Sequence, residues 1–201
     1  MERILHILRC PLCGGAFLRK DNSLVCPNRH TYDVARQGHV NFVPGQKEMF
    51  YKKELFESRA KVFEAGVYAP VVDRLTQAIE RYAPQENMVL LDAGCGDGWY
   101  LSELLCARPD WCGAGVDISR DAVLQATSMP CTALWCVADL RRLPFRDGAF
   151  TAVLDVLTPA SYDEFRRVLA PGGVLIKVYP GRQYLRELRE ARGMPLYEEG
   201  Q

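Results

Sequence analysis

Short apolar runs alternate with helix-like patterns through the second half of the chain. Five such runs, bounded by glycine, proline or charged residues, predict strands at Met88–Ala93, Gly113–Asp117, Ala133–Ala138, Ala152–Leu157 and Val174–Tyr179. Segments between or after them space their apolar residues as helices do: Tyr100–Ala107, Arg120–Ala126, Ser161–Leu169 and Gln183–Arg192. Because strands and helices alternate, we predict an α/β fold with a doubly wound, mainly parallel sheet.

Two further helices are predicted ahead of this region. Lys47–Glu64 mixes many charged residues with spaced apolar ones, and Ala69–Tyr82 repeats apolar residues at i, i+3, i+4 and i+7. Gly66 lies between the two patterns and is expected to separate the helices. We therefore divide the chain into an N-terminal module (residues 1–45), a helical linker (46–84) and an α/β domain (85–201).

The N-terminal module is rich in turn residues and too poor in apolar ones to form a core of its own, so it needs a cross-link. Its cysteines and one histidine follow the pattern Cys10-x2-Cys13-x12-Cys26-x3-His30. Zinc prefers four such ligands in a tetrahedron, and each close pair can chelate from one tight turn. Four protein ligands leave no position for a substrate, so we predict a structural zinc ion.

An alternative interpretation makes these residues three ordinary buried thiols and a surface histidine. The other five cysteines lie in apolar stretches and are expected to be buried free thiols, as in proteins of a reducing compartment. His6 and His39 each stand alone in the sequence. We expect them at the surface or in packing contacts rather than as metal ligands.

Length and charge narrow the picture further. The 201 residues allow one full domain and a small module. The net charge of zero is a cancellation: residues 1–61 carry 11 basic and 6 acidic side chains, a net +5, and residues 62–201 carry 14 and 19, a net −5. We find no apolar run of the ~20 residues needed to cross a bilayer and no export signal. We therefore expect a cytoplasmic protein without a membrane segment.

A glycine-rich loop follows the first predicted strand of the α/β domain, with the sequence Asp92-Ala93-Gly94-Cys95-Gly96-Asp97-Gly98. Glycines at alternate positions let the backbone pass close under a ligand, and the next helix offers unpaired amides. Asp117 and Asp139 close the two following strands, where a carboxylate can bind ribose hydroxyls. The alternative is that these glycines only turn the chain. It does not explain why acids stand at three strand ends, at Asp92, Asp117 and Asp139.

Two kinds of cofactor compete for this arrangement. A dinucleotide needs the pattern G-x-G-x-x-G and a loop free of negative charge for its pyrophosphate. This loop has G-x-G-x-G, with Asp92 before it and Asp97 inside it. Carboxylates suit a cationic ligand with an amino-acid end, and S-adenosylmethionine (SAM) is such a ligand. We therefore predict SAM as the cofactor.

With Phe145–Phe150 and Val168–Gly173, the domain resembles class I SAM-dependent methyltransferases. The whole chain, which also contains Tyr32–Asn41 and Arg59–Pro70, resembles the 23S ribosomal RNA guanine-N1 methyltransferases. The resemblance implies zinc ligation by the four module residues and ribosomal RNA as the partner. It also implies a SAM pocket lined or shaped by Tyr68, Asp92, Gly94, Gly96, Trp99, Tyr100, Asp117 and Asp139. Gly98, Leu140 and Tyr184 complete the predicted cofactor site.

The implied reaction is an in-line transfer of the sulfonium methyl group to a guanine ring nitrogen, which must lose its proton. Asp155, at the end of the fourth predicted strand, is the predicted catalytic carboxylate; a polar contact to the cofactor would explain it equally well. A basic module and a basic first helix are expected to hold RNA phosphates, and the aromatic Phe50 and Tyr51 to stack on bases. The basic residues of that helix are Lys47, Lys52, Lys53, Arg59 and Lys61. A solvated mixed-charge surface is the alternative.

The sequence departs from the family pattern at three places, on the substrate side or beyond it. Leu157-Thr158-Pro159 lacks an aromatic residue before its small-residue–proline step, and Tyr184 stands where the family tends to have histidine. Two further strands of the full class I sheet are not found before Gln201, so an edge is expected to be covered by a partner or a second copy, as in a homodimer. Two alternatives therefore remain: a SAM-binding RNA-associated protein without catalysis, and a small-molecule methyltransferase whose zinc module serves dimerisation.

Overall fold

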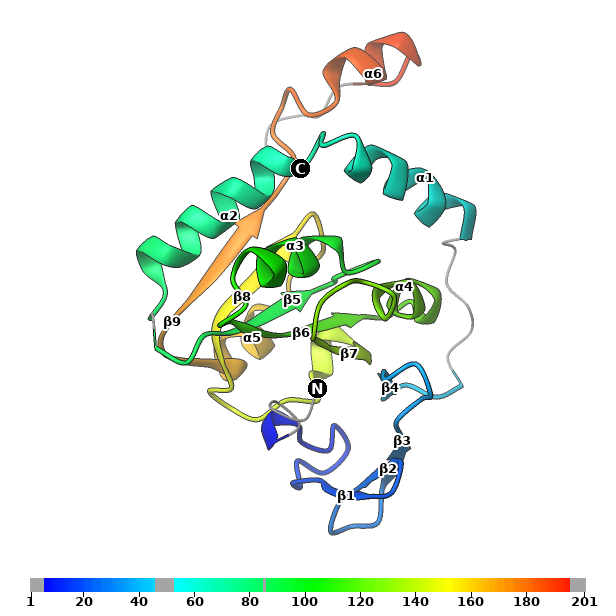
Figure 1. The fold of residues 1–201 in the computed structure, drawn as a ribbon, viewed down its shortest axis with the longest axis vertical. Helices are drawn as coiled ribbons and strands as arrows, with labels where there is room; N and C mark the ends of the chain where they lie inside the picture. Colours follow the sequence, from blue (N-terminus) through cyan, green and yellow to red (C-terminus); the bar gives the residue numbers. More distant parts are fainter. Residues whose placement is uncertain (1–5, 46–52, 85, 196–201) are drawn as a thin grey trace.

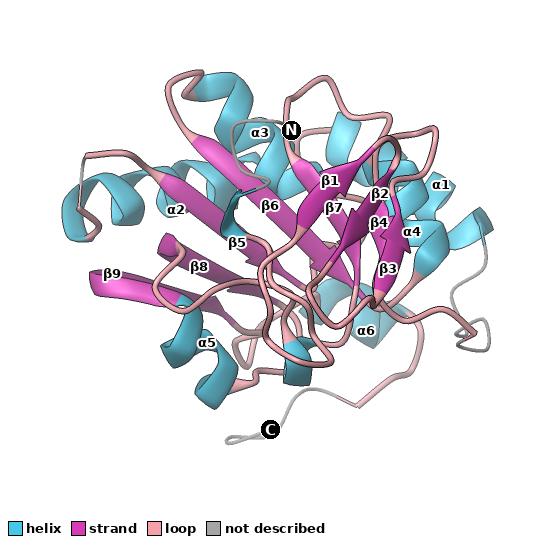
Figure 2. Ribbon diagram, turned by 90° about the horizontal axis from the view of Figure 1, so that it is seen from below, coloured by secondary structure: helices cyan, strands magenta, loops and turns pink. Residues whose placement is uncertain are grey.

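A six-stranded parallel sheet forms the centre of the molecule (Figures 1 and 2). The structure is a computed structural model, and it describes residues 6–45, 53–84 and 86–195. The strand order is β4-β7-β6-β5-β8-β9. The strands are β4 (Val40–Asn41), β5 (Val89–Ala93), β6 (Cys112–Asp117), β7 (Leu134–Val137), β8 (Phe150–Val156) and β9 (Leu169–Val178). The predicted α/β fold with a mainly parallel sheet is confirmed.

The last strand begins earlier than its apolar run. β9 starts at Leu169, five residues before the predicted Val174, and Leu169 pairs with Phe150 across an irregularity in β8. The family resemblance implies that Arg166–Gly173 forms the helix and turn before this strand, and proline and glycine are poor strand residues. In the structure the bulge absorbs these residues, and regular pairing resumes at Val174.

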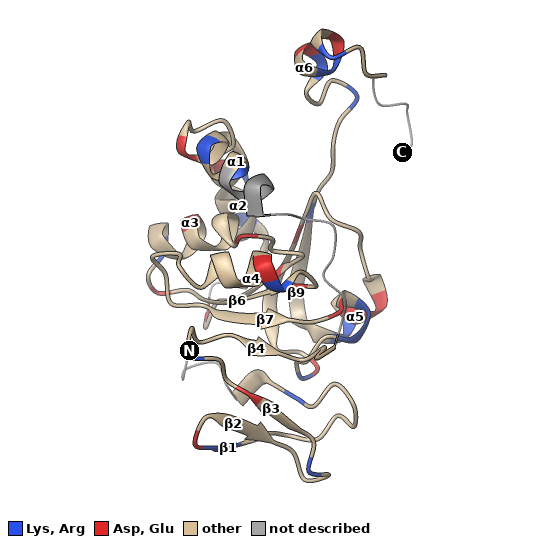
Figure 3. Cartoon of the chain, turned by 90° about the vertical axis from the view of Figure 1, so that its right-hand side faces the viewer, with Lys and Arg blue, Asp and Glu red and all other residues tan. Residues whose placement is uncertain are grey.

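Helices cover both faces of this sheet. On one face lie α2 (Ala69–Tyr82), α3 (Trp99–Ala107) and α4 (Arg120–Ala126), whose apolar residues share a buried cluster with the strands. On the other face lies α5 (Tyr162–Val168), and there Phe165 and Val168 pack beside residues of the N-terminal module. The short α6 (Arg186–Ala191) lies at the end of the molecule opposite the module (Figure 3).

The N-terminal module is joined to the sheet by backbone pairing. Its own antiparallel sheet consists of β1 (Leu18–Lys20), β2 (Ser23–Val25) and β3 (Thr31–Asp33). β4 then pairs in parallel with β7, so that the module supplies the edge strand of the large sheet. Its side chains Leu8 and Phe42 are buried in the same cluster as strand residues of the α/β domain. The sequence predicted five strands, and this sixth one comes from outside the predicted domain.

The linker is helical, as its pattern predicts. Helix α1 (Lys53–Glu64) and α2 are separated at Gly66, whose positive φ of 73° suits a residue without a side chain. Lys47, Phe50, Tyr51 and Lys52, which we had expected to contact RNA, lie outside the described residues. Within the described residues no helix is long and apolar enough to span a membrane.

β9 is the edge strand of the sheet as described, at the end opposite β4. Its apolar residues Val174, Leu175 and Ile176 are only half-buried, whereas β7 is buried along its whole length. Edge strands with accessible backbone groups and apolar side chains are places where other chains can pair. Among the residues that the structure describes, the sheet therefore ends at β9 on this side.

Candidate cofactor and metal sites

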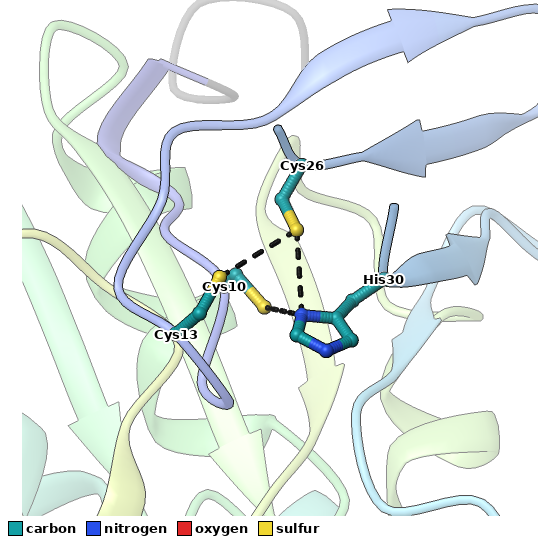
Figure 4. Close-up of side chains that lie close together, drawn as sticks. All are labelled: Cys10, Cys13, Cys26 and His30. Carbon is teal, nitrogen blue, oxygen red and sulfur yellow. Dashed lines mark hydrogen bonds between the residues drawn. The ribbon is translucent and has the colours of Figure 1, made fainter. Parts of the chain in front are cut away.

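The four predicted zinc ligands come together in the N-terminal module (Figure 4). Their ligand atoms all lie within 4.8 Å of one another. The Cys10 and Cys26 sulfurs are each 3.4 Å from Nδ1 of His30, and Sγ of Cys13 is 3.6 Å from Sγ of Cys26. Zinc bonds of about 2.3 Å to sulfur and about 2.0 Å to nitrogen place tetrahedral ligands about 3.5–3.8 Å apart. The cluster therefore has the dimensions of a closed, structural zinc site.

Local backbone geometry holds these ligands in place. Gly14 has a φ of 72°, and its N–H donates to the carbonyl of Cys10 across the first turn. A hydrogen bond from the Gly15 backbone is the main reason that the pKa of Cys13 falls to about 6. A thiol with so low a pKa is largely ionised at neutral pH, and the thiolate is the form that binds zinc.

The glycine-rich loop joins β5 to α3 and runs under the carboxyl ends of the strands. Gly94, Gly96 and Gly98 all have positive φ, and two of them are also closely packed. A Cβ at Gly94 would lie 2.4 Å from Oγ1 of Thr158, and one at Gly98 would lie 2.6 Å from the Trp135 ring. Both positions therefore require glycine, for space as well as for conformation.

Three carboxylates surround this loop and are held in different ways. Asp117, at the end of β6, accepts hydrogen bonds from the backbone N–H groups of Gly96 at 2.9 Å and of Ser119 at 2.8 Å. Asp92 and Asp97 are almost fully buried, at 1% and 4% exposure. Oδ2 of Asp92 and Oδ1 of Asp97 have no hydrogen-bond partner in the part of the chain that the structure describes.

Burial and mutual repulsion change the titration of these acids. Burial, together with the charges of Asp117 and Asp97, raises the pKa of Asp92 to about 7. Burial also raises the pKa of Asp97, although the nearby Arg59 guanidinium opposes the shift. Buried carboxylates with unsatisfied oxygens are costly on their own. The loop is therefore prepared for a ligand that carries positive charge.

An aromatic cluster closes the side of the loop that faces the linker. Phe63 of α1 stacks on Trp99, the first residue of α3, with ring centroids 4.4 Å apart and planes 4° apart. Tyr68 and Tyr100 meet edge to face at 6.3 Å, and the Tyr68 hydroxyl is 2.7 Å from that of Tyr184. Three aromatic residues predicted for the cofactor site thus lie together with Tyr184, next to Phe63, which the prediction did not include.

Asp139 and Leu140 lie at the start of the short 3-10 helix η2 (Leu140–Arg142), after β7. Asp139 caps that helix by accepting from the Arg141 backbone N–H at 2.9 Å. The Arg141 guanidinium also binds its carboxylate, with an Nη2–Oδ2 distance of 2.7 Å, and lowers the pKa of Asp139. This third strand-end acid is neutralised within the chain, unlike the buried acids of the loop.

Asp155 lies in β8 and is fully buried. Lys177, its partner in the register of β9, donates from Nζ to Oδ2 of Asp155 at 2.5 Å and to the Thr158 carbonyl at 3.2 Å. Oδ1 of Asp155 has no partner among the described residues, and burial raises its pKa against the effect of Lys177. The pair holds the loop after β8, which packs on Gly94.

Sequence reasoning missed three residues that contact the predicted site. Thr158 lies over Gly94, Lys177 binds Asp155, and Arg59 lies over Gly96. Of these, only Arg59 left a signal in the sequence, since it precedes Phe63 by four residues and so shares a face of α1 with it. The other two depend on strand register and loop packing.

Comparison with known proteins places both halves of the chain. Residues 8–49 match a zinc-ribbon family model described as "RlmA, N-terminal", and residues 90–173 match one described as "Methyltransferase domain". The structure of the plantazolicin methyltransferase BpumL in complex with SAH is similar, with a TM-score of 0.55 over 71% of this chain and 59% of that one. At 15% identity this likeness shows the methyltransferase fold alone.

Two curated relatives match nearly the whole chain. A Bacillus subtilis protein named "Putative 23S rRNA (guanine-N(1)-)-methyltransferase YxjB" is 38% identical over 92% of this chain and 68% of its own length. The 23S rRNA (guanine(748)-N(1))-methyltransferase of Streptomyces fradiae is 36% identical over 96% of this chain and 70% of its own. Their similarity extends through the zinc module, the linker and the α/β domain. The chain belongs to the family of 23S rRNA (guanine-N1) methyltransferases.

Proposed function

We propose that this protein transfers the methyl group of SAM to N1 of a guanine in 23S ribosomal RNA. The names of its relatives support the reaction and the substrate. In the molecule itself, the observation that carries the proposal is the pair of buried carboxylates, Asp92 and Asp97, with unpartnered oxygens beside the glycine-rich loop. They match the positive charges of SAM and would repel the pyrophosphate of a dinucleotide.

The residues present fit SAM. Asp92 and Asp97 would hold its cationic amino-acid end, Asp117 would accept from its ribose hydroxyls, and Asp139 with Leu140 would lie beside its adenine. Tyr68, Trp99, Tyr100 and Tyr184 would enclose the cofactor, and Gly94, Gly96 and Gly98 would keep the loop backbone close to it. When bound, SAM supplies an electrophilic methyl group on a sulfonium.

The protein must position the guanine and remove a proton. As the bond from N1 to the methyl carbon forms and the sulfur–carbon bond breaks, the proton of N1 has to pass to a base. We keep Asp155 as the predicted acceptor, because its Oδ1 is unpartnered and burial raises its pKa. The same unpartnered oxygen is equally consistent with the alternative role of Asp155, a polar contact to the cofactor.

The zinc ribbon is proposed to bind the RNA. Several of its basic side chains are exposed: Arg19, Lys20, Arg29 and Arg36. Figure 3 marks basic positions of the chain in blue. Lysine and arginine neutralise RNA phosphates, and the acidic remainder of the chain is suited to a cationic cofactor instead. A protein that modifies ribosomal RNA would act in the cytoplasm, where ribosomes are assembled.

We also keep a homodimer as part of the proposal, since the β9 edge is open in the described structure. Light scattering after size exclusion tests it directly. A mass of twice 22.7 kDa supports the dimer, and a single-chain mass contradicts it.

Labelled methyl transfer tests the activity. The purified protein is incubated with labelled SAM and 23S rRNA from a strain that lacks the endogenous enzyme, and the nucleosides are identified by mass spectrometry after digestion. We expect label in 1-methylguanosine, and loss of that label in Asp92→Asn but not in Asp163→Asn, which changes an exposed acid. SAM binding by calorimetry without label in RNA would instead support the non-catalytic alternative.

A further inference from the structure

A cationic side chain of the linker, that of Arg59, lies beside the glycine-rich loop. Arg59 of α1 lies over the loop, with Nη1 3.4 Å and Nη2 3.7 Å from the position that a Cβ would take at Gly96. A side chain at position 96 would therefore touch the guanidinium, which lies beside the loop at Gly96. Its charge opposes the raised pKa values of Asp92, Asp97 and Tyr100, so it acts on the whole acidic pocket.

Neighbouring side chains orient the Arg59 guanidinium but leave most of its hydrogen-bond donors unused. Its carbon lies 5.3 Å from the centroid of the Phe63 ring, and Phe63 in turn stacks on Trp99. Its contact with Asp97 is loose, with Nε 3.9 Å from Oδ2, beyond hydrogen-bonding distance. No closer ion pair or hydrogen bond of this guanidinium joins it to another described side chain. A planar group with five donors is therefore held in place with bonding capacity to spare.

SAM carries a carboxylate that could accept hydrogen bonds from the Arg59 guanidinium. The methionine end of SAM carries two cationic centres, which suit the carboxylates, and one carboxylate, which those same carboxylates would repel. An arginine fork binds a carboxylate through two parallel hydrogen bonds. We propose that Arg59 binds the methionine carboxylate of SAM and thereby makes helix α1 part of the cofactor site. This inference rests on the proposed use of SAM.

A structural role for Arg59 predicts something different. If the guanidinium only offsets the charge of Asp97, its removal would leave a more negative pocket, and every cationic ligand would bind as well or better. If it only packs against Phe63, its removal would weaken all ligands alike. A carboxylate contact affects SAM and spares a ligand that lacks the carboxylate.

Calorimetry with SAM and with decarboxylated SAM separates these cases. We expect the unmodified protein to bind SAM roughly 10- to 100-fold more tightly than decarboxylated SAM, as for a charge-assisted pair. In Arg59→Met the SAM affinity should fall by that factor, while the affinity for decarboxylated SAM stays the same or rises. Arg59→Lys should keep part of the preference.

Lys61→Met is the matched control, because Lys61 is an exposed cation on the same helix. It should leave both affinities unchanged, and the thermal midpoint of each variant checks that it folds. Equal weakening of both ligands by Arg59→Met, or no weakening of either, would overturn the role of Arg59 and leave the proposed function standing. Absence of SAM binding to the unmodified protein would overturn the proposed function itself.

Discussion

The molecule has two clusters of groups that can carry negative charge, and the clusters differ in how closely their groups lie together. In the zinc module, Cys10, Cys13 and Cys26 lie with His30 in a compact group whose closest ligand atoms are 3.4 to 3.6 Å apart. At the glycine-rich loop, Asp92 lies in β5, Asp97 in the loop and Asp117 at the end of β6. Asp92 and Asp97 are buried with unpartnered oxygens. The first group has the dimensions to close on one small ion, and the second keeps carboxylate oxygens without partners among the described residues.

The two arrangements correspond to how long each ligand must remain bound to the protein. A metal that cross-links a module with little core of its own must remain bound, so all its ligands come from the chain and no position is open. A cofactor consumed in every turnover must leave, so its site cannot be so strongly anionic that an empty pocket unfolds the protein. A carboxyl group with a pKa of about 7 answers this need, because it can hold a proton when the ligand is gone.

The largest expected effect follows from breaking the zinc cluster. Cys26→Ser should reduce bound zinc from about one equivalent per chain to near zero. It should destabilise the protein by at least about 3 kcal/mol, a fall of roughly 10 °C in the thermal midpoint. Elemental analysis and thermal unfolding measure the two quantities. Cys106 is exposed, so the expectation that every cysteine outside the module is buried is wrong for this residue. Cys106→Ser is the control, and full metal content in Cys26→Ser would refute the site.

A smaller loss of stability is expected from closing the cofactor loop with a side chain. In Gly98→Ala the new methyl group meets the Trp135 ring and Ala126, at a φ of 79° that L-residues rarely adopt. We expect a cost of about 2–4 kcal/mol in the free energy of unfolding. Gly181→Ala, where nothing lies within 4 Å, should cost less than about 0.5 kcal/mol. Equal effects in chemical denaturation would show that loop packing is not the cause.

The titration of Asp92 predicts how SAM binding depends on pH. Below its pKa of about 7 the empty site holds a proton that a cationic ligand must displace, so affinity should rise about tenfold between pH 6 and pH 8. In Asp92→Asn, calorimetry should show a flat profile and an affinity at least about tenfold below that of the unmodified protein at pH 8. A flat profile in the unmodified protein would place the titrating group elsewhere.

The same group links pH to stability, with the opposite sign. Because folding raises the pKa of Asp92 above its ordinary value, its favourable contribution is complete below about pH 4 and is lost as pH rises through about 7. Without ligand, Asp92→Asn should therefore gain stability relative to the unmodified protein across this interval. Denaturant unfolding at several pH values measures the difference, and a constant difference would contradict the assignment.

The smallest effect is expected where the chain neutralises its own acid. Arg141 is largely exposed, so its ion pair with Asp139 is screened by solvent. Arg141→Gln should leave the thermal midpoint unchanged within error and SAM affinity within about twofold. A large loss of affinity would mean that Asp139 must be held by Arg141 to receive the cofactor, which would place it with the loop acids.

The sequence predicts features that lie within one continuous segment better than contacts between distant segments. The zinc cluster could be predicted completely, because two short spacings define both ligand pairs. The strands β5 to β8 and the glycine-rich loop could also be predicted, since each is written in one continuous segment. The contact of Arg59 with Gly96 could not, because it joins segments 37 residues apart and depends on how α1 docks.

Register and very short elements set the other limit. The pairing of Asp155 with Lys177 follows from the alignment of β8 with β9, which starts earlier than its apolar run. β4 has only two residues, Val40 and Asn41, and so shows no periodic pattern. It is a strand because β7 offers an open edge, which is a property of the folded sheet and not of the segment.

That two-residue strand has a consequence for the choice of nucleotide. Val40 and Asn41 pair with Cys136 and Val137, and Val137 lies two residues before Asp139, which follows the carboxyl end of β7. Backbone pairing and a shared core leave the ribbon little freedom to swing relative to the sheet. An RNA bound by the zinc ribbon would therefore place its target base at a fixed distance from the ribbon. Position along the RNA would be selected by span as well as by base contacts.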